Sequence, residues 1–168
     1  MKAFAELFSA LDSSTSTTHK LQALVTYFRD APPADAAWAV YFLSGGKPKR
    51  TVPTRTLREV ALSVSALPDW LFEECYQAVG DLAETIALLI PEAPQAGVLE
   101  SENTQTRGLN YWMTERILPL RAMEEEYRLQ AVMQCWTELS RDERFLFVKL
   151  VGGGLRVGVS KLLVTRAL

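Results

Sequence analysis

Two segments of the sequence combine glycines with cations in a way that suits the binding of phosphate groups. Residues 38–57 read WAVYFLSGGKPKRTVPTRTL and residues 145–164 read FLFVKLVGGGLRVGVSKLLV. In each, an aromatic-rich helical stretch ends at glycines, and a cation-bearing turn leads to a Thr or Ser that starts the next helix. Glycines let the backbone approach a ligand closely, and the first amides of a helix lack partners. We call residues 45–55 the first glycine corner and residues 152–161 the second.

The candidate phosphate-binding residues are the cations, hydroxyls and glycines of these corners. They are Lys47, Lys49, Arg50, Thr54, Arg55, Gly153, Gly154, Arg156, Gly158, Ser160 and Lys161. The glycine runs begin 107 positions apart (152 − 45), so the corners would occupy corresponding places in two half-domains and could hold two stretches of a sugar-phosphate backbone. The same pattern is typical of an ordinary helical corner with a glycine C-cap. The pattern alone leaves both interpretations open.

The charge distribution favours a local anion site over a generally basic protein. The net charge is −2, with 18 cations against 20 acids, yet residues 47–58 hold five cations and no acid. Glutamates are frequent later, between residues 92 and 126. A basic stripe on a mildly acidic body can bind a polyanion locally. A solvated run of surface charges would look the same.

The sequence offers no convincing active site or metal site. His19 is the only histidine and is expected on a helix surface, and the sequence contains no GxxxxGK[ST] loop for a nucleotide. Cys75 and Cys135 stand alone without metal-ligand spacing, so we expect buried thiols in a reducing compartment. No apolar run reaches the ~18–20 residues of a membrane span. We therefore expect a cytoplasmic protein without catalytic residues, metal ligands or membrane contact in this chain.

Hydrophobic spacing predicts an all-α fold, a single compact helical domain of roughly ten helices, either undivided or divided into two pseudo-symmetric halves. Thr18, Thr54 and Ser160 are predicted N-caps, and Ser140 with Glu143 predicts a capping box. The helical pattern resumes at about residue 109 and is interrupted near residue 119. Residues 91–107 lack periodicity and collect Pro, Gly, Asn, Thr and Glu, which predicts a surface loop.

Three stretches, taken in order, resemble one protein family. They are APPADAAWAVYFLSGGKPKRTVPTRTLREVA, PDWLFEECYQAVGDLAETIALLIP and LSRDERFLFVKLVGGGLRVGVSKLLVTRAL. Together they resemble the N-terminal DNA-binding domain of bacterial ATP-dependent DNA ligases, and the resemblance covers essentially the whole chain. In that family a Leu-Arg-hydrophobic-Gly motif precedes a helix whose start meets DNA phosphates. Here the motif is LRVG at residues 155–158, followed by Ser160 and Lys161.

The resemblance implies one domain of a longer enzyme. Residues 1–168 would be the helical DNA-binding domain with its 91–107 loop, and the nucleotidyltransferase and OB-fold domains are absent from this sequence. The family's adenylated lysine lies in a Lys-x-Asp-Gly motif, and none of the six lysines here begins one. ATP and magnesium would therefore serve the parent DNA ligase, which seals nicks through an adenylated lysine and AMP-DNA. We expect this chain alone to be non-catalytic and to need no cofactor.

The expected function is sequence-independent binding of nicked duplex DNA through the phosphate backbone and minor groove. Such binding would serve DNA repair, recombination or replication. The expected partners are double-stranded DNA and the catalytic domains of the same polypeptide, with the protein acting as a monomer. The alternative is a helical protein-interaction module that does not bind nucleic acid.

Overall fold

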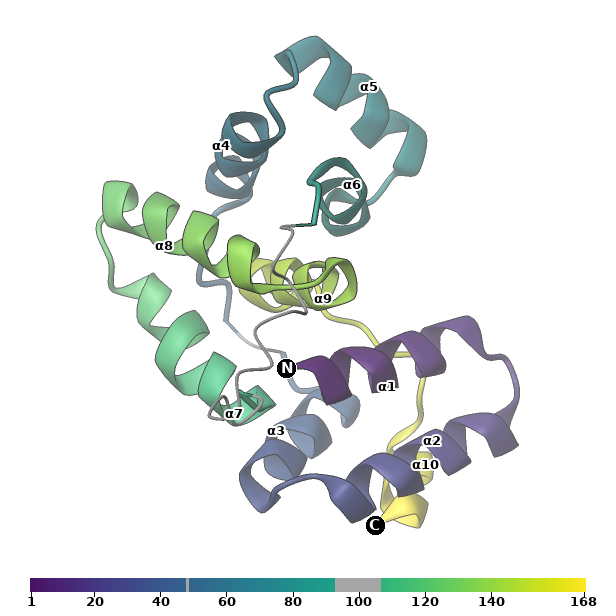
Figure 1. The fold of residues 1–168 in the computed structure, drawn as a ribbon. Helices are drawn as coiled ribbons and strands as arrows, with labels where there is room; N and C mark the ends of the chain where they lie inside the picture. The colour runs from purple at the N-terminus through teal and green to yellow at the C-terminus, as the bar shows by residue number, and fades with distance from the viewer. Residues whose placement is uncertain (48, 93–106) are drawn as a thin grey trace.

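The computed structural model describes residues 1–47, 49–92 and 107–168, and within these ranges it contains helices and no strands (Figure 1). The helices are α1 (Lys2–Ser13), α2 (Thr17–Asp30), α3 (Pro33–Leu43), α4 (Thr54–Ser65), α5 (Asp69–Val79), α6 (Leu82–Leu89), α7 (Leu109–Tyr111), α8 (Glu125–Glu138), α9 (Arg141–Gly152) and α10 (Lys161–Ala167). The predicted all-α fold of roughly ten helices is confirmed. Most of the predicted 91–107 loop, residues 93–106, lies outside the described residues, as does Pro48 of the first glycine corner.

The core is organised around α9. Its side chains Leu146, Phe147, Leu150 and Val151 are fully buried. Helices α1 and α6 pack against α9, α2 packs against α1, and α10 packs against α2 and α3. In Figure 1, α9 lies between a group formed by α4, α5 and α6 and a group formed by α1, α2, α3 and α10. Helix α9 is therefore flanked by both groups.

Two helix starts follow the predicted local rules. The Ser140 hydroxyl accepts from the Glu143 amide at 3.4 Å, and the Glu143 carboxylate accepts from the Ser140 amide at 3.1 Å. This reciprocal pair confirms the predicted capping box. The predicted cap Ser160 is also confirmed, because its hydroxyl accepts from the amide of Leu163 at 3.2 Å.

Two other predicted caps are wrong by one or two residues. Thr18 lies inside α2, which is capped by the Ser16 hydroxyl. Thr54 is the first residue of α4, because Pro53 has extended backbone and its carbonyl accepts the first helical hydrogen bond, from Leu57 at 3.2 Å. Proline fixes its own φ near the helical value and needs no amide partner, so it can start a helix without a capping side chain.

The predicted interruption near Pro119 is confirmed and has a definite form. After α7 the chain continues as a π-helical segment, Trp112–Ile117, and then a 3-10 segment, Leu118–Arg121, that contains Pro119. Proline lacks the amide that a continuing α-helix would use, so the pitch changes there. The segment stays attached to the core through the buried side chains of Trp112 and Met113.

The isolated histidine and cysteines occupy structural positions. His19 is exposed in the first turn of α2, as predicted. Cys135 is buried and burial raises the pKa of its thiol, but Cys75 is only half-buried, which corrects the expectation of two buried thiols. Cys75 lies on α5, which packs mainly against α6 and so leaves part of its circumference open. None of the helices in the described ranges is long and apolar enough to span a lipid bilayer.

Asp81 joins α6 to α9 and makes the stability of this joint depend on pH. One carboxylate oxygen accepts from the Glu84 amide at 3.0 Å, and the other accepts from the ammonium of Lys149. Burial alone would raise the pKa of Asp81, but these hydrogen bonds outweigh it and hold the pKa below its ordinary value. Since the folded-state pKa is depressed, the stabilisation is present above the unfolded pKa and is lost as the pH falls through the folded pKa.

We therefore expect Asp81→Asn to be less stable than wild type at neutral pH and equally stable in acid. Asparagine keeps the N-cap but loses the charge that faces Lys149, which costs about 0.5–1 kcal/mol for a partly exposed pair. Urea unfolding at about pH 7 and about pH 3 measures the difference at each pH. A difference that is as large in acid as at neutral pH would show that the ion pair contributes nothing.

Candidate nucleic-acid interface

The two glycine corners lie together because the first corner donates hydrogen bonds to carbonyls at the end of α9. The last four carbonyls of an α-helix have no partner within the helix. In α9 the first two of these carbonyls accept hydrogen bonds from the second corner. The Lys149 carbonyl accepts from the Gly154 amide, and the Leu150 carbonyl accepts from the Gly153 amide.

The remaining two carbonyls of α9 accept from the first corner. The Val151 carbonyl accepts from the amides of Thr51 at 2.9 Å and Val52 at 3.2 Å, and Arg50 Nε donates to the Gly152 carbonyl at 3.3 Å. Thr51 and Val52 are buried at this contact. We call it the corner joint. It places the first corner directly beside the second, although 100 residues separate Thr51 from Val151.

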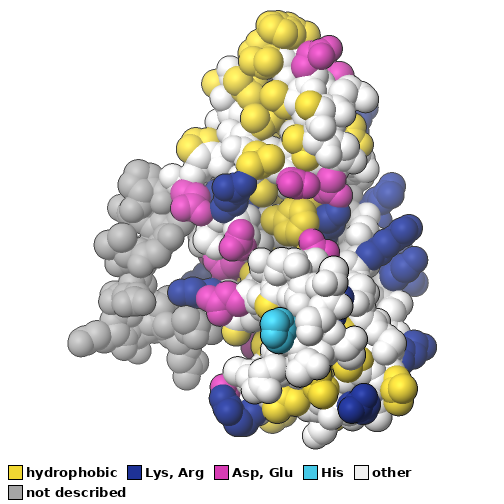
Figure 2. Space-filling view, turned by 90° about the vertical axis from the view of Figure 1, so that its right-hand side faces the viewer, with side chains coloured by type: hydrophobic (Ala, Val, Ile, Leu, Met, Phe, Trp, Pro, Cys, Tyr) yellow, Lys and Arg dark blue, Asp and Glu magenta, His cyan; other side chains and the backbone are white. Residues whose placement is uncertain are grey.

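Five cations of the two corners are exposed and keep their charge available. No ion pair with Asp or Glu is formed within the described residues by Lys47, Lys49, Arg50, Arg156 or Lys161. Figure 2 shows Lys and Arg side chains gathered along the right-hand edge of the molecule at mid-height, with the visible Asp and Glu side chains away from that edge. Such a segregated edge attracts a polyanion in spite of the acidic net charge.

Two other cations of the basic stretch already have acidic partners. Arg55 Nε donates to Glu59 at 2.8 Å, one turn along α4. Arg58 donates to Asp69 at 2.9 Å and to Glu73 at 2.5 Å on α5. Arg55 is the last residue of the first corner and remains highly exposed, but its charge is partly compensated by Glu59. The corner cations outside α4 therefore contribute most of the local positive charge.

The glycines of the corners have two different roles, ending a helix or leaving the backbone accessible. Gly45 has φ +90° and Gly153 has φ +71°, so each adopts the left-handed conformation that ends the preceding helix. Gly154 and Gly158 have no positive φ, and a Cβ on Gly154 would meet nothing within 4 Å. Gly158 likewise has open space around it, with only the Lys20 ammonium near, at 3.6 Å from the position of a Cβ. The open sides of Gly154 and Gly158 leave their backbone accessible.

Two hydroxyls flank this surface at the starts of α4 and α10. Thr54 and Ser160 are both exposed. The Ser160 oxygen accepts from Leu163 as the cap of α10, and its own O–H remains a donor that can point outward. Lys161 follows it directly and is exposed as well. Each corner therefore presents cations, a hydroxyl and open backbone on neighbouring segments.

Lys20 is a cation of this region that the sequence reasoning missed. It lies in α2 and its ammonium donates to the Gly158 carbonyl at 2.8 Å, so it reaches the second corner from a helix 138 residues away in sequence. No local pattern around Lys20 predicts this contact, because it depends on the packing of α2 against α10.

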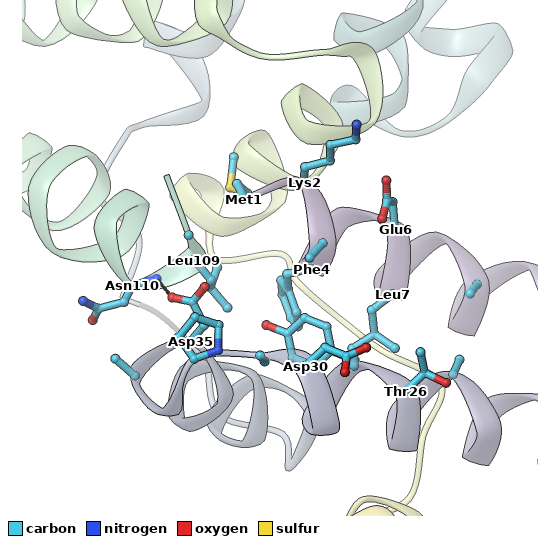
Figure 3. A pocket seen from close by; sticks show the side chains of 18 of the residues that line it. Met1, Lys2, Phe4, Glu6, Leu7, Thr26, Asp30, Asp35, Leu109 and Asn110 are labelled. Carbon is cyan, nitrogen blue, oxygen red and sulfur yellow. Dashed lines mark hydrogen bonds between the residues drawn. The ribbon is translucent and has the colours of Figure 1, made fainter. Parts of the chain in front are cut away.

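A large pocket elsewhere on the molecule is lined by more acids than cations. A pocket of about 1350 Å³ lies between α1 and α2 and reaches the start of α7 (Figure 3). Phe4 and Leu7 line it, together with the carboxylates of Asp30 and Asp35. Asp35 accepts from the Asn110 amide at 2.7 Å and so ties α3 to α7. Glu6 adds a third carboxylate and Lys2 is the only Lys or Arg among the lining residues, so the pocket suits an anion less well than the corners do.

The comparison with known proteins decides the family. Residues 1–168, the whole chain, match the family described as DNA ligase N terminus. The chain belongs to this family. No curated protein matches it. The resemblance seen in three separate stretches of the sequence is thus confirmed over the full length of this ligase domain.

The corner joint of the ligase domain gathers groups that can contact phosphates. Within residues 1–47, 49–92 and 107–168, no three His, Cys, Asp or Glu side chains lie together so that they could hold a metal ion. The corner joint instead brings together cations and accessible backbone, which are the groups that contact phosphates. In the LRVG motif of the family resemblance, Arg156 and Gly158 are exposed on this surface, while Leu155 is buried in the core.

Proposed function

We propose that this domain binds duplex DNA, including nicked duplex, through its phosphate backbone and without reading sequence. The observation that carries the proposal is the corner joint. By tying Thr51 and Val52 to the Val151 carbonyl, it sets Lys47, Lys49 and Arg50 beside the segment that holds Arg156. Phosphate contacts of this kind position a protein on DNA and carry no sequence information.

The surface suits contacts to two stretches of backbone more than binding of one small ligand. Its cations are spread over two chain segments, and both are exposed. A minor-groove approach would bring both segments against phosphates on either side of the groove. The net charge of −2 reduces the long-range attraction between the domain and DNA. The isolated domain is therefore expected to bind DNA weakly, with further affinity coming from other domains.

We further propose that the domain belongs to an ATP-dependent DNA ligase that acts in repair, recombination or replication in the cytoplasm. Self-adenylation, ATP binding and magnesium binding are assigned to catalytic domains of the same polypeptide, because no lysine here begins a Lys-x-Asp-Gly motif. The domain would place the nick for those catalytic domains and would act as a monomer. Incubation with radiolabelled ATP should leave no AMP covalently bound to this chain.

A fluorescence-anisotropy titration at several salt concentrations tests the binding proposal. The probes are two duplexes of unrelated sequence, each intact and nicked. We expect equal affinity for the two sequences and a log–log salt slope that reflects release of several counterions, about 0.9 per phosphate contacted. Binding that differs strongly between the two sequences would contradict the proposal, as would absence of binding at low salt.

A protein-interaction module is the second candidate, and exposed aromatic side chains favour it. Trp70 on α5 is 67% exposed and Tyr127 on α8 is 63% exposed. Large aromatic side chains are enriched at protein interfaces. In Figure 2 the upper part of the molecule shows mostly hydrophobic side chains. This candidate function gains support if the chain does not bind DNA at any salt concentration.

A further inference from the structure

The Lys20 ammonium occupies a special position in the second glycine corner. Its hydrogen bond to the Gly158 carbonyl, 2.8 Å long, ties α2 to the turn between Arg156 and Lys161. A Cβ on Gly158 would meet the Lys20 ammonium and no other group within 4 Å. The ammonium is therefore the immediate neighbour of the open backbone at this glycine.

A bare carbonyl would be unfavourable on a surface that receives phosphates. Its oxygen carries partial negative charge and would repel a phosphate oxygen. The Lys20 ammonium covers this oxygen with a cation, and it still has two further N–H donors after one is used. Arg50 does the same in the corner joint, where its Nε covers the Gly152 carbonyl at 3.3 Å. Two carbonyls of the second corner are thus covered by cations, one from α2 and one from the first corner.

We propose that Lys20 extends the DNA-binding surface onto α2, with two roles. It holds the Gly158 carbonyl and so positions the residues 155–159 turn, and its remaining donors bind the same phosphate backbone as Arg156. The inference rests on the proposed function, since it assigns a new residue and a third element to that surface. The ligand is the DNA phosphate backbone.

The test compares Lys20→Met with Lys2→Met, which removes an exposed lysine from α1. The probe is a nicked duplex followed by fluorescence anisotropy at several salt concentrations. Lys20→Met should weaken binding about five- to tenfold and lower the salt slope by about one. Lys2→Met should change affinity less than twofold. Lys20→Arg should keep most of the affinity, because a guanidinium can reach the same carbonyl with a positive charge.

A double variant separates positioning from simple charge. If Lys20 also positions the turn that bears Arg156, the losses in Lys20→Met/Arg156→Ala should not multiply, and the double variant should bind more tightly than the product of the single losses. Circular dichroism and thermal melting should match wild type, since Lys20 is a surface cation. Independent losses would remove the positioning role and overturn that half of the proposal.

The comparison with Arg156→Ala distinguishes the inference from the proposed function. If Arg156→Ala weakens binding while Lys20→Met binds as wild type, the surface does not reach α2 and the inference is wrong, although the domain still binds DNA. If neither variant binds differently from a wild type that itself binds, the second corner is not the interface. The inference is then wrong and so is the assignment of the second corner to the binding surface, although the domain binds DNA. Weakening in both, with Lys2→Met unchanged, supports the inference.

Discussion

A variant with Lys47, Lys49 and Arg156 all replaced by Gln is expected to bind duplex DNA about 100- to 1000-fold more weakly than wild type at about 0.1 M salt. At that concentration each phosphate contact contributes nearly tenfold through counterion release, and the variant loses three. The log–log salt slope should fall by about three. Arg50 is left in place because it donates to the Gly152 carbonyl in the corner joint.

A matched control removes the same charge elsewhere. Lys2, Arg121 and Arg141 are exposed, lie outside both corners and form no side-chain ion pair within the described part of the chain. Replacing all three by Gln removes as much positive charge as the corner variant does. It should weaken binding less than about tenfold, because only the long-range electrostatic attraction between protein and DNA is reduced. Equal losses in the two triple variants would show that DNA responds to net charge and not to the corners. Thermal melting of both should stay close to wild type.

The second large effect concerns stability. Arg144 is 1% exposed and its guanidinium lies among backbone carbonyls. It donates to the carbonyls of Ile90 at 2.7 Å, Trp136 at 3.3 Å, Leu139 at 3.3 Å and Pro91 at 3.5 Å. Burial lowers the pKa of Arg144 from its ordinary value, while the nearby Glu92 carboxylate acts in the opposite direction. The side chain thus joins the ends of α6 and α8 to the first turn of α9.

We expect Arg144→Met to lower the free energy of unfolding by about 3–5 kcal/mol, because buried carbonyls lose their donors and cost about 1–3 kcal/mol each when unsatisfied. The melting temperature should fall by roughly 10 °C. Urea unfolding followed by circular dichroism measures the change. Arg144→Lys should fall between wild type and Arg144→Met, because an ammonium keeps the charge but cannot span all four carbonyls.

The control for this prediction lies three residues earlier on the same helix. The Arg141 side chain is exposed, so Arg141→Met should stay within about 0.5 kcal/mol of wild type. If Arg144→Met unfolds at the wild-type urea concentration, water must replace the guanidinium at the carbonyls and the side chain is not a structural tie. DNA binding by a still-folded Arg144→Met should remain near wild type, since Arg144 does not reach the surface.

Features set by near neighbours in the chain could be predicted from the sequence. The capping box of Ser140 and Glu143, the Ser160 cap and the change of pitch at Pro119 each depend on contacts within four residues. The all-α fold and the glycine corners belong to the same class, because periodicity and glycine C-caps are local signals. The one-residue error at Thr54 arose where Pro53 could begin the helix without a capping side chain.

Only the tertiary structure decided how the corners lie and which cations remain available. Thr51 and Val52 meet the Val151 carbonyl because α9 ends with carbonyls that its own turn does not satisfy, and Lys20 meets Gly158 because α2 packs against α10. Arg58 looked as available as Lys49 in the sequence, but Asp69 and Glu73 of α5 reach its guanidinium. Contacts across 100 or more residues depend on how whole helices pack, and no short stretch of sequence contains that information.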